Sequence, residues 1–190
     1  MMPRLLIAAG LVVVTGALAW ALFVVLPRRH AAPTAQTVQQ AAPAAPVVPG
    51  RRIKARLFYV SEDGTALTAV ERDVPFAESA VDQAREIAAA EVAPVALPLV
   101  SPVPAGTVVR SVFISPSGQA YVDLSREVLS AHSGGTLAEL LTVYSLVDAL
   151  TVNLPAISAV QLLVDGKEAD TLAGHVDVRR PLAKNLAWVQ

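Results

Sequence analysis

The sequence predicts an α+β domain, in which two helices pack on one mixed β-sheet, preceded by a single transmembrane helix at the N-terminus. Three observations lead to this prediction: a long apolar run near the start, two later segments with helical spacing of apolar residues, and several short alternating segments bounded by turn residues. The elements follow the order ββαββαβ, which is typical of helices packed on a sheet. We therefore divide the 190 residues into a short tail (1–4), a membrane anchor (5–26), an Ala/Pro-rich linker (27–50) and a globular domain (51–190).

The predicted anchor runs from Leu5 to Leu26, 22 residues without a charge. As a helix it would span about 33 Å, which is enough to cross the core of a bilayer. A cleaved signal peptide is the alternative, because Ala17-Leu18-Ala19 resembles a cleavage site. The apolar run continues for seven residues beyond that site, so we favour an uncleaved anchor. Basic residues flank both ends, and we place the domain outside the cytoplasm because a short N-terminal tail usually stays inside.

The segment between the anchor and the domain is predicted to be a linker. Residues 31–50 contain no charged side chain and repeat alanine and proline, with prolines at positions 33, 43, 46 and 49. Such a composition favours extended, polyproline-like conformations and cannot build a core. Fully stretched, this segment would hold the domain up to about 60 Å from the membrane.

Composition excludes several kinds of function. The chain has no cysteine, which excludes disulfides, thiolate metal sites, cysteine nucleophiles and a lipidated cysteine. From Arg51 onward there are 12 basic and 16 acidic residues, a net charge of −4. A negative domain in a chain with only 5% aromatic residues is a poor candidate for nucleic-acid binding.

The first half of the domain predicts a hairpin followed by a helix. Apolar and polar residues alternate in Arg52–Val60, and Leu67–Val74 follows after the turn sequence Ser61-Glu62-Asp63-Gly64. Residues 79–92 place apolar side chains on one stripe, and Ser79 is the predicted N-cap of this helix. Residues 93–107 carry four prolines and are predicted to be a loop.

The second half predicts another hairpin, a long helix and a strand. Residues 108–114 and 119–124 flank a Ser-Pro-Ser-Gly turn, and residues 159–164 form the last long strand. The helix between them begins with Thr136, which we expect to form a capping box with Glu139. We expect little of this helix to face water, and we expect the strand at residues 159–164 to cover it. The predicted apolar face comprises Leu137, Leu140, Leu141, Tyr144, Val147 and Leu150. Val176 and Val178 alternate in the tail and suggest an edge strand that Pro181 ends.

Several short segments of the sequence, taken together, resemble one known family, the GerMN domain of sporulation and spore germination. They are LFYV, ERDVP, PAGTVVRSVFIS with GQAYVDLS, SGG, and VQLLVDGKEADTLAGHVDVRRPL, and they cover nearly all of residues 53–182. The resemblance implies a small, non-enzymatic α/β domain that is exported and tethered by a lipid or a membrane helix. This chain differs from the best-known members in having one copy of the domain and no lipidated cysteine.

Two candidate sites lie just before the long helix. His132 and Ser133, with Asp148 or Asp165, suggest a Ser-His-Asp arrangement, although no nucleophile-elbow pattern surrounds the serine. The simpler interpretation is a flexible turn at residues 133–135. Gly134-Gly135 could hold an anion on free backbone N–H groups, but the pair lacks the longer phosphate-loop pattern.

Further candidates are pairs of charged residues. His175 and Asp177 could be metal ligands, although His175 more simply binds a backbone or carboxylate partner. Asp123 and Glu127 could form a carboxylate pair, although Asp123 more simply caps the turn at Ser125. Asp165-Gly166 is typical of a tight turn. The pairs Arg51-Arg52 and Arg179-Arg180 are expected to be solvated, with anionic headgroups or wall polymer as possible contacts.

We assign no catalytic, cofactor-binding or metal-binding residue from the sequence. The expected function is a non-enzymatic, single-pass module of the plasma (inner) membrane, anchored through residues 5–26, whose extracytoplasmic domain binds an envelope protein or a second copy of itself. The alternative is a module that binds peptidoglycan, which the low aromatic content disfavours. A wall hydrolase would need a metal site or a carboxylate cleft, and the residues suggest neither.

Overall fold

A computed structural model describes residues 50–190. The predicted tail, the transmembrane helix at residues 5–26 and the linker up to residue 49 lie outside the described residues. Within residues 50–190, no helix combines the length and the apolar character needed to cross a bilayer. The elements are β1 (Arg52–Val60), β2 (Leu67–Pro75), α3 (Ala80–Val92), β3 (Val109–Ile114), β4 (Gln119–Leu124), α4 (Glu127–Ser130), α5 (Thr136–Asn153), β5 (Ala159–Val164), β6 (Lys167–Glu168), β7 (Leu182–Ala183) and the 3₁₀ helix η2 (Leu186–Trp188).

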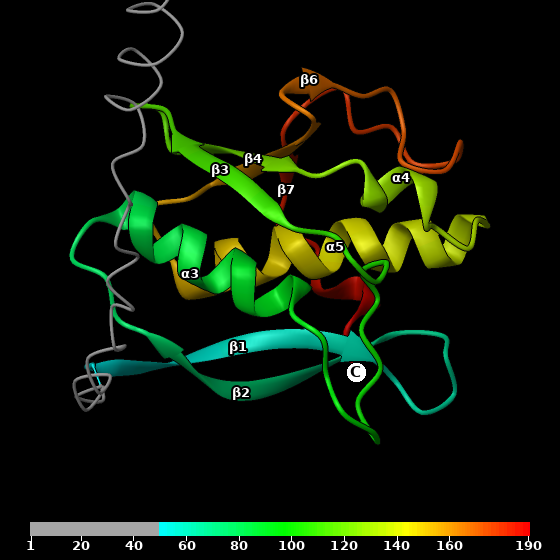
Figure 1. Ribbon diagram of the computed structural model, residues 1–190, viewed down its shortest axis with the longest axis horizontal. Helices are drawn as coiled ribbons and strands as arrows, with labels where there is room; N and C mark the ends of the chain where they lie inside the picture. The colour runs from blue at the N-terminus through cyan, green and yellow to red at the C-terminus, as the bar shows by residue number, and fades with distance from the viewer. Residues whose placement is uncertain (1–49) are drawn as a thin grey trace, which may run out of the picture. The chain divides into compact units, whose positions relative to one another are not determined.

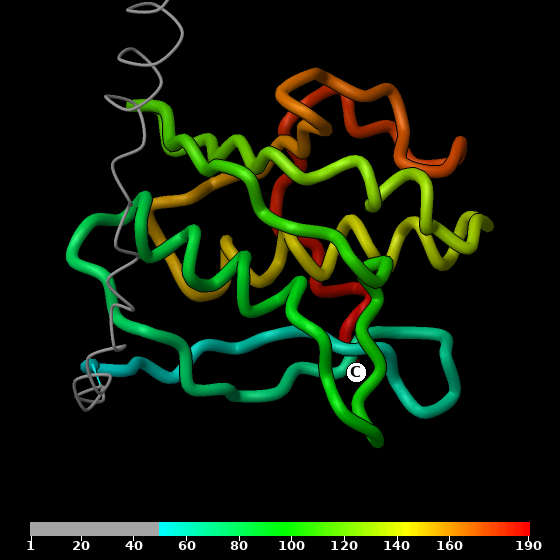
Figure 2. The backbone as a smooth tube through the Cα atoms, in the orientation of Figure 1, coloured from blue at the N-terminus to red at the C-terminus, as the bar shows by residue number. Residues whose placement is uncertain are grey.

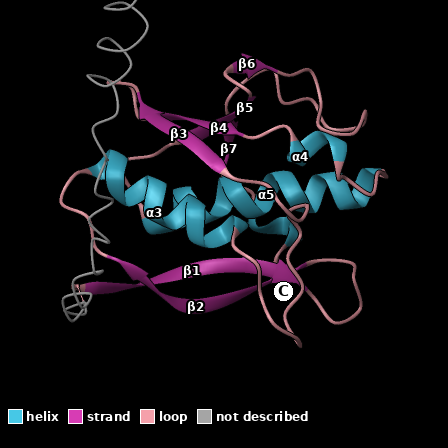
Figure 3. Ribbon diagram, viewed as in Figure 1, coloured by secondary structure: helices cyan, strands magenta, loops and turns pink. Residues whose placement is uncertain are grey.

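The two long helices lie between two β-sheets. Figure 1 shows α3 and α5 with the β1–β2 hairpin on one side and the sheet containing β3, β4 and β5 on the other. The larger sheet has the order β3-β4-β5-β6, with β7 also paired to β5; β4 and β5 are parallel and the other pairs are antiparallel. The predicted α+β class and mixed sheet are therefore confirmed. The prediction of one sheet is wrong, because the first hairpin forms a sheet of its own (Figure 3).

Helix α5 needs cover on both sides because it is apolar almost all round. Eleven of its 18 residues are buried, including Leu146 and Leu150, so the expectation that little of it faces water is confirmed. The mixed sheet covers it from one side, and the end of β1 packs from the other with Leu57 and Phe58 fully buried. Leu137, assigned from its spacing to the buried face, is instead 39% exposed.

The outer edge of β1 is closed by side chains and by one loop. Asn153 at the end of α5 accepts from the backbone N–H of Arg56 and donates to its carbonyl, both at 2.8 Å. Glu91 of α3 accepts from the N–H of Phe58 at 3.1 Å. The N–H of Val60 donates to a loop carbonyl at 2.9 Å. An edge covered in this way cannot pair with another strand.

One predicted helix cap is confirmed and the other is wrong. Ser79 is the N-cap of α3, and its hydroxyl accepts from the N–H of Asp82 at 3.0 Å. Helix α5 has Gly135 as its N-cap, without a side-chain cap, so Thr136 and Glu139 form no capping box. Glu139 is fully buried and has tertiary partners instead.

The Glu139 carboxylate holds the loop between β6 and β7. Oε1 accepts from the N–H groups of Leu172 and Ala173 at 2.7 and 2.8 Å, and Oε2 accepts from the N–H of His175 at 2.8 Å. Burial opposes ionisation, but these N–H groups outweigh it and lower the pKa of Glu139. The ionised form therefore stabilises the fold above the unfolded pKa, and this contribution is lost as the pH falls through the folded pKa.

The C-terminal segment joins the two sheets. The predicted strand at Val176 and Val178 is wrong, because Glu139 shapes this loop and the strand β7 forms only after Pro181. In Figure 2 the segment continues from the mixed sheet, past α5, to the β1–β2 hairpin. There the N–H of Gln190 donates to the carbonyl of Leu67 at 2.9 Å. The predicted Asp-Gly turn is confirmed between β5 and β6, where both residues have positive φ.

Glu91 gives the fold a testable dependence on pH. Full burial raises its pKa well above the ordinary value, and the hydrogen bond from Phe58 only partly opposes this. The folded state therefore keeps a proton that the unfolded chain releases above a pH of about 4.5, so stability falls as the pH rises through that range. We expect Glu91→Gln to remove this loss. Its free energy of unfolding should exceed that of the wild type by an amount that grows above pH 4.5, on the order of 1 kcal/mol per pH unit.

Urea unfolding between pH 4 and 8 measures this difference. Glu62→Gln, at an exposed turn position, is the control and should give a nearly constant difference. A constant difference for Glu91→Gln as well would contradict the assignment of a protonated Glu91.

Candidate functional site

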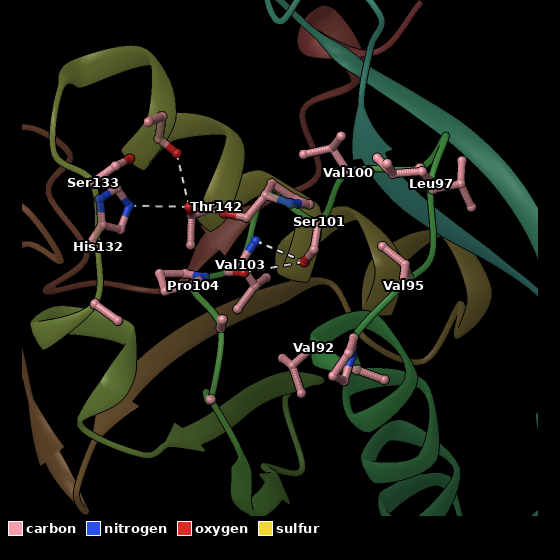
Figure 4. A pocket seen from close by; sticks show the side chains of 18 residues that line it. Val92, Val95, Leu97, Val100, Ser101, Val103, Pro104, His132, Ser133 and Thr142 are labelled. Carbon is pink, nitrogen blue, oxygen red and sulfur yellow. Dashed lines mark hydrogen bonds between the residues drawn. The ribbon is translucent and has the colours of Figure 1, made fainter.

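An uncharged groove lies between the proline-bearing segment 93–107 and the N-terminal half of α5. It consists of two adjoining hollows of about 500 and 530 Å³, which share Ser101, Pro102, Ser133 and Ala138 in their walls. We call the two hollows together the apolar groove. Figure 4 shows the first hollow, with Leu97 and Val100 on one side and His132, Ser133 and Thr142 on the other.

The sequence explains why segment 93–107 forms a wall and not a strand. Its four prolines lack N–H donors and cannot continue a ladder. Two of the contacts that hold the segment involve its own valines: the carbonyl of Val100 accepts from the N–H of Val60, and the side chain of Val103 is buried in the core. Val95 and Leu99 are partly buried against the core, whereas Leu97 is 86% and Val100 49% exposed. Across the groove, the exposed Leu137 lies in the first turn of α5.

A chain of hydrogen bonds fixes the opposite wall. His132 Nδ1 accepts from the N–H of Gly134 at 2.9 Å, which leaves the proton on Nε2, and Nε2 lies 3.2 Å from Thr142 Oγ1. The Thr142 hydroxyl lies 2.6 Å from the carbonyl of Pro102 and 2.9 Å from that of Ala138, and donates to this pair. The loop before α5, α5 itself and the proline-bearing segment are thereby tied together.

The groove has no ionised side chain in its walls. Neither hollow is lined by an Asp, Glu, Lys or Arg, and His132 is the single histidine among the lining residues. Burial lowers the pKa of His132; the nearby Glu139 raises it and His175 lowers it, with a net lowering. His132 is therefore neutral at neutral pH. A neutral, partly exposed apolar surface of this kind can bind apolar side chains but offers no charge to a polar ligand.

The structure does not bring the Ser-His-Asp candidates together. Both ring nitrogens of His132 have other partners, as described above. Asp148 accepts from the N–H of Asn185 at 2.9 Å, and Asp165 accepts from Arg110 at 3.1 Å. Each carboxylate is thus committed to a structural contact away from the serine.

Gly134 and Gly135 form the turn into α5, as the simpler interpretation predicted. Both have positive φ, 81° and 90°, and a Cβ atom on either would meet no atom within 4 Å. Glycine is therefore required by the backbone conformation and not by close packing. Anion binding at this pair stays a prediction.

The metal and carboxylate pairs are also separated by their contacts. His175 Nδ1 lies 3.2 Å from Glu139, whereas Asp177 accepts from Arg179 at 2.6 and 3.0 Å, so the carboxylate partner expected for His175 is confirmed. Within residues 50–190, no three His, Asp or Glu side chains gather as metal ligands would.

We predicted that Asp123 caps the turn at Ser125, and this prediction is wrong. Its Oδ1 accepts from the N–H of Gly166 at 2.7 Å and its Oδ2 from Arg110 at 3.1 Å, so it ties β4 to the turn after β5. Ser125 instead hydrogen-bonds to the side chain of Glu127 and lowers the pKa of that carboxyl. Asp123 and Glu127 therefore have separate partners.

The arginine pairs have local partners on the surface. Arg51 lies 4.1 Å over the ring of Phe76, Arg52 donates to the carbonyl of Asp73 at 2.7 Å, and Arg179 forms a two-point contact with Asp177. Arg180 is exposed, as expected of a solvated charge. Contact of these arginines with headgroups or wall polymer stays a prediction.

Sequence reasoning missed the groove itself. Its signal was present in VALPLVSPV (residues 95–103), which is too apolar for an ordinary exposed loop. The prolines identified a loop correctly, but no local rule indicates that such a loop lies against a helix start.

Comparisons with known proteins agree on one family. Residues 56–170 match the family model Germane, described as "Sporulation and spore germination". No curated protein sequence matches the chain.

Two solved structures share the fold. The tandem GerMN domains of the sporulation protein GerM from Bacillus subtilis superpose with a TM-score of 0.52 at 23% identity, over 72% of this chain and 46% of that chain. The chain therefore spans about half the length of that structure. A "Putative Lipoprotein" from Clostridium perfringens gives a TM-score of 0.50 at 20% identity, over 75% of this chain and 93% of that chain.

We expect the Thr142 hydroxyl to hold the groove together. Thr142→Val keeps the shape but leaves the Pro102 carbonyl and His132 Nε2 without their partner, which should lower the free energy of unfolding by about 2 kcal/mol. Thr151→Val is the matched control, because the Thr151 hydroxyl donates only to Val147 within the same helix, at 2.8 Å. Chemical denaturation should give a clearly smaller loss for the control. Equal losses would show that Thr142 contributes nothing beyond α5.

Proposed function

We propose that this chain, which belongs to the Germane family of sporulation and spore germination, is a non-enzymatic module that binds another protein chain through the apolar groove. The resemblance to the GerMN domain is confirmed by the family match and the shared fold. We further propose that residues 5–26 anchor the chain in the plasma membrane and place the domain in the bacterial envelope. The relative described as a "Putative Lipoprotein" supports an envelope location.

One observation carries the proposal: apolar side chains that belong in a core are exposed around an uncharged hollow. Leu97, Val100 and Leu137 line the groove and are all exposed. Exposing such a cluster costs free energy, roughly 2 kcal/mol for each large aliphatic side chain kept in water. Contiguous exposed apolar surface is typical of a protein-binding site. The hydrogen-bonded walls support binding without a large rearrangement.

A second candidate function is binding to peptidoglycan, and one observation favours it. Phe113 is 60% exposed on β3, and its ring centroid lies 6.1 Å from that of Tyr121 on β4. Aromatic faces of this kind can stack on sugars. We rank this candidate second because the pair is small and neither ring lines the apolar groove.

Site-directed crosslinking in cells tests the proposal. The chain has no cysteine, so Leu97→Cys introduces a unique thiol into the groove, to which a maleimide–diazirine reagent can be attached. We expect illumination to join residue 97 to a protein. Phe113→Cys, an apolar position outside the groove that is also more than half exposed, is the control and should give no protein adduct.

Two results would count against the proposed function. Adducts of equal yield at both positions would indicate non-specific contact, and protein adducts at position 113 alone would move the binding surface to the sheet. An adduct with wall glycan at position 113 would favour the second candidate.

A further inference from the structure

We propose that His132 is a pH-sensitive latch on the turn at residues 133–135: the neutral ring holds this turn in the groove wall, and the protonated ring releases it. The inference goes beyond the proposed function, because it concerns the wall itself and does not depend on what the groove binds. It rests on the hydrogen bonds of the ring, on the freedom of the turn to move, and on the ionisable groups near the ring.

The hydrogen bond at Nδ1 of His132 exists only while the ring is neutral. The N–H of Gly134 donates to this nitrogen at 2.9 Å. A neutral imidazole has one nitrogen that accepts, whereas both nitrogens of the protonated ring are donors. Protonation therefore places an N–H of the ring against the N–H of Gly134, and this contact must break.

The turn, and not the ring, is the part that can move. The other ring nitrogen, Nε2, lies 3.2 Å from Thr142 Oγ1, and the protonated ring keeps its N–H at this position (Figure 4). The Thr142 hydroxyl is itself fixed by the carbonyls of Pro102 and Ala138. By contrast, the turn contains two glycines, neither with an atom within 4 Å of its Cβ position, and it gives α5 no side-chain cap. A weakly held turn therefore moves away from an anchored ring.

Release of the turn would change both the shape and the charge of the apolar groove. Ser133 lines both hollows, and Gly134 and Gly135 line the second one. The protonated ring of His132 would also add a positive charge to walls that have no Asp, Glu, Lys or Arg. The groove is thus uncharged and closed by the turn at neutral pH, and charged and more open in acid.

Two ionisable groups near the ring set the pH at which the latch opens. Burial opposes the charged ring most, Glu139 on α5 favours it, and His175 in the loop between β6 and β7 opposes it. The net effect lowers the pKa of His132 below the ordinary value of about 6.5. The proline-bearing wall presents no ionisable side chain to the ring. The latch is therefore closed at neutral pH and opens below pH 6.5.

Exchange of the Gly134 N–H with water tests the latch, and the sequence supplies an internal reference. Two of the ten glycines follow a serine, Gly118 and Gly134. Labelling the full chain with ¹³C-serine and ¹⁵N-glycine therefore selects these two amides by NMR in detergent micelles. The N–H of Gly118 donates to the carbonyl of Ser115 at 2.9 Å, an acceptor that does not titrate. Because both amides belong to Ser-Gly pairs, the ratio of their rates removes the pH dependence of exchange itself.

We expect the exchange rate of Gly134, relative to that of Gly118, to be constant above pH 7. It should rise about tenfold once the His132 ring is charged, which is the effect of losing one hydrogen bond. ¹⁵N-labelled histidine reports the charge of the ring in the same titration. In His132→Asn, which cannot titrate, the ratio should not change with pH. In His175→Asn the rise should persist and move to higher pH, because a group that opposes the charged ring is gone.

Four outcomes would overturn the inference. A constant ratio in the wild type while the His132 ring is charged would show that the ring does not hold the turn. A rise that remains in His132→Asn, or that disappears in His175→Asn, would assign the effect to another group. A His132 ring that stays neutral until the domain unfolds would show that the folded chain has no such latch. The proposed function is unaffected by all four, because the crosslinking at position 97 tests it separately.

Discussion

The structure depends on buried polar contacts made by α5, which act together with the buried side chains of Val103, Leu172 and Val178 to hold the loops around this helix. A polar residue occurs at every third position from Glu139 to Thr151, and all five are buried: Glu139, Thr142, Ser145, Asp148 and Thr151. Each step of three residues turns about 300° around the helix, so the row winds around α5. Its members therefore reach different neighbours, among them the loop at residues 172–175, the proline-bearing segment, and Asn185 near the C-terminus.

This arrangement explains how a small domain keeps an apolar surface exposed. Segment 93–107 contributes few backbone donors, so its position depends on Thr142, on the bridge between Val60 and Val100, and on the buried Val103. These contacts fix the wall from below and leave Leu97 and Val100 facing outward. Covering the groove with another apolar surface would remove the cost of that exposure, and this is the basis of the proposed binding role.

The sequence predicted what local rules determine. The hairpin turns, the Ser79 cap and the four hairpin strands depend on neighbours within a few residues, and these are found, whereas the alternation of Val176 and Val178 forms no strand. The predicted capping box does not form because the Glu139 carboxylate accepts from three N–H groups of a distant loop instead of from a backbone N–H at the start of its own helix. The buried contact with the loop is the stronger of the two. The groove was unpredictable for the same reason: prolines identify a loop, but only tertiary contacts place it.

Polar side chains of α5 hold the loops around this helix in fixed positions. Native-state hydrogen exchange of the N–H groups of Leu172, Ala173 and His175 tests this most directly, because each donates to Glu139. The claim predicts that these three loop amides exchange nearly as slowly as amides in the middle of α5 at neutral pH, and that all three lose protection in Glu139→Gln. Exchange in the wild type as fast as at the exposed turn residue Glu62 would contradict it.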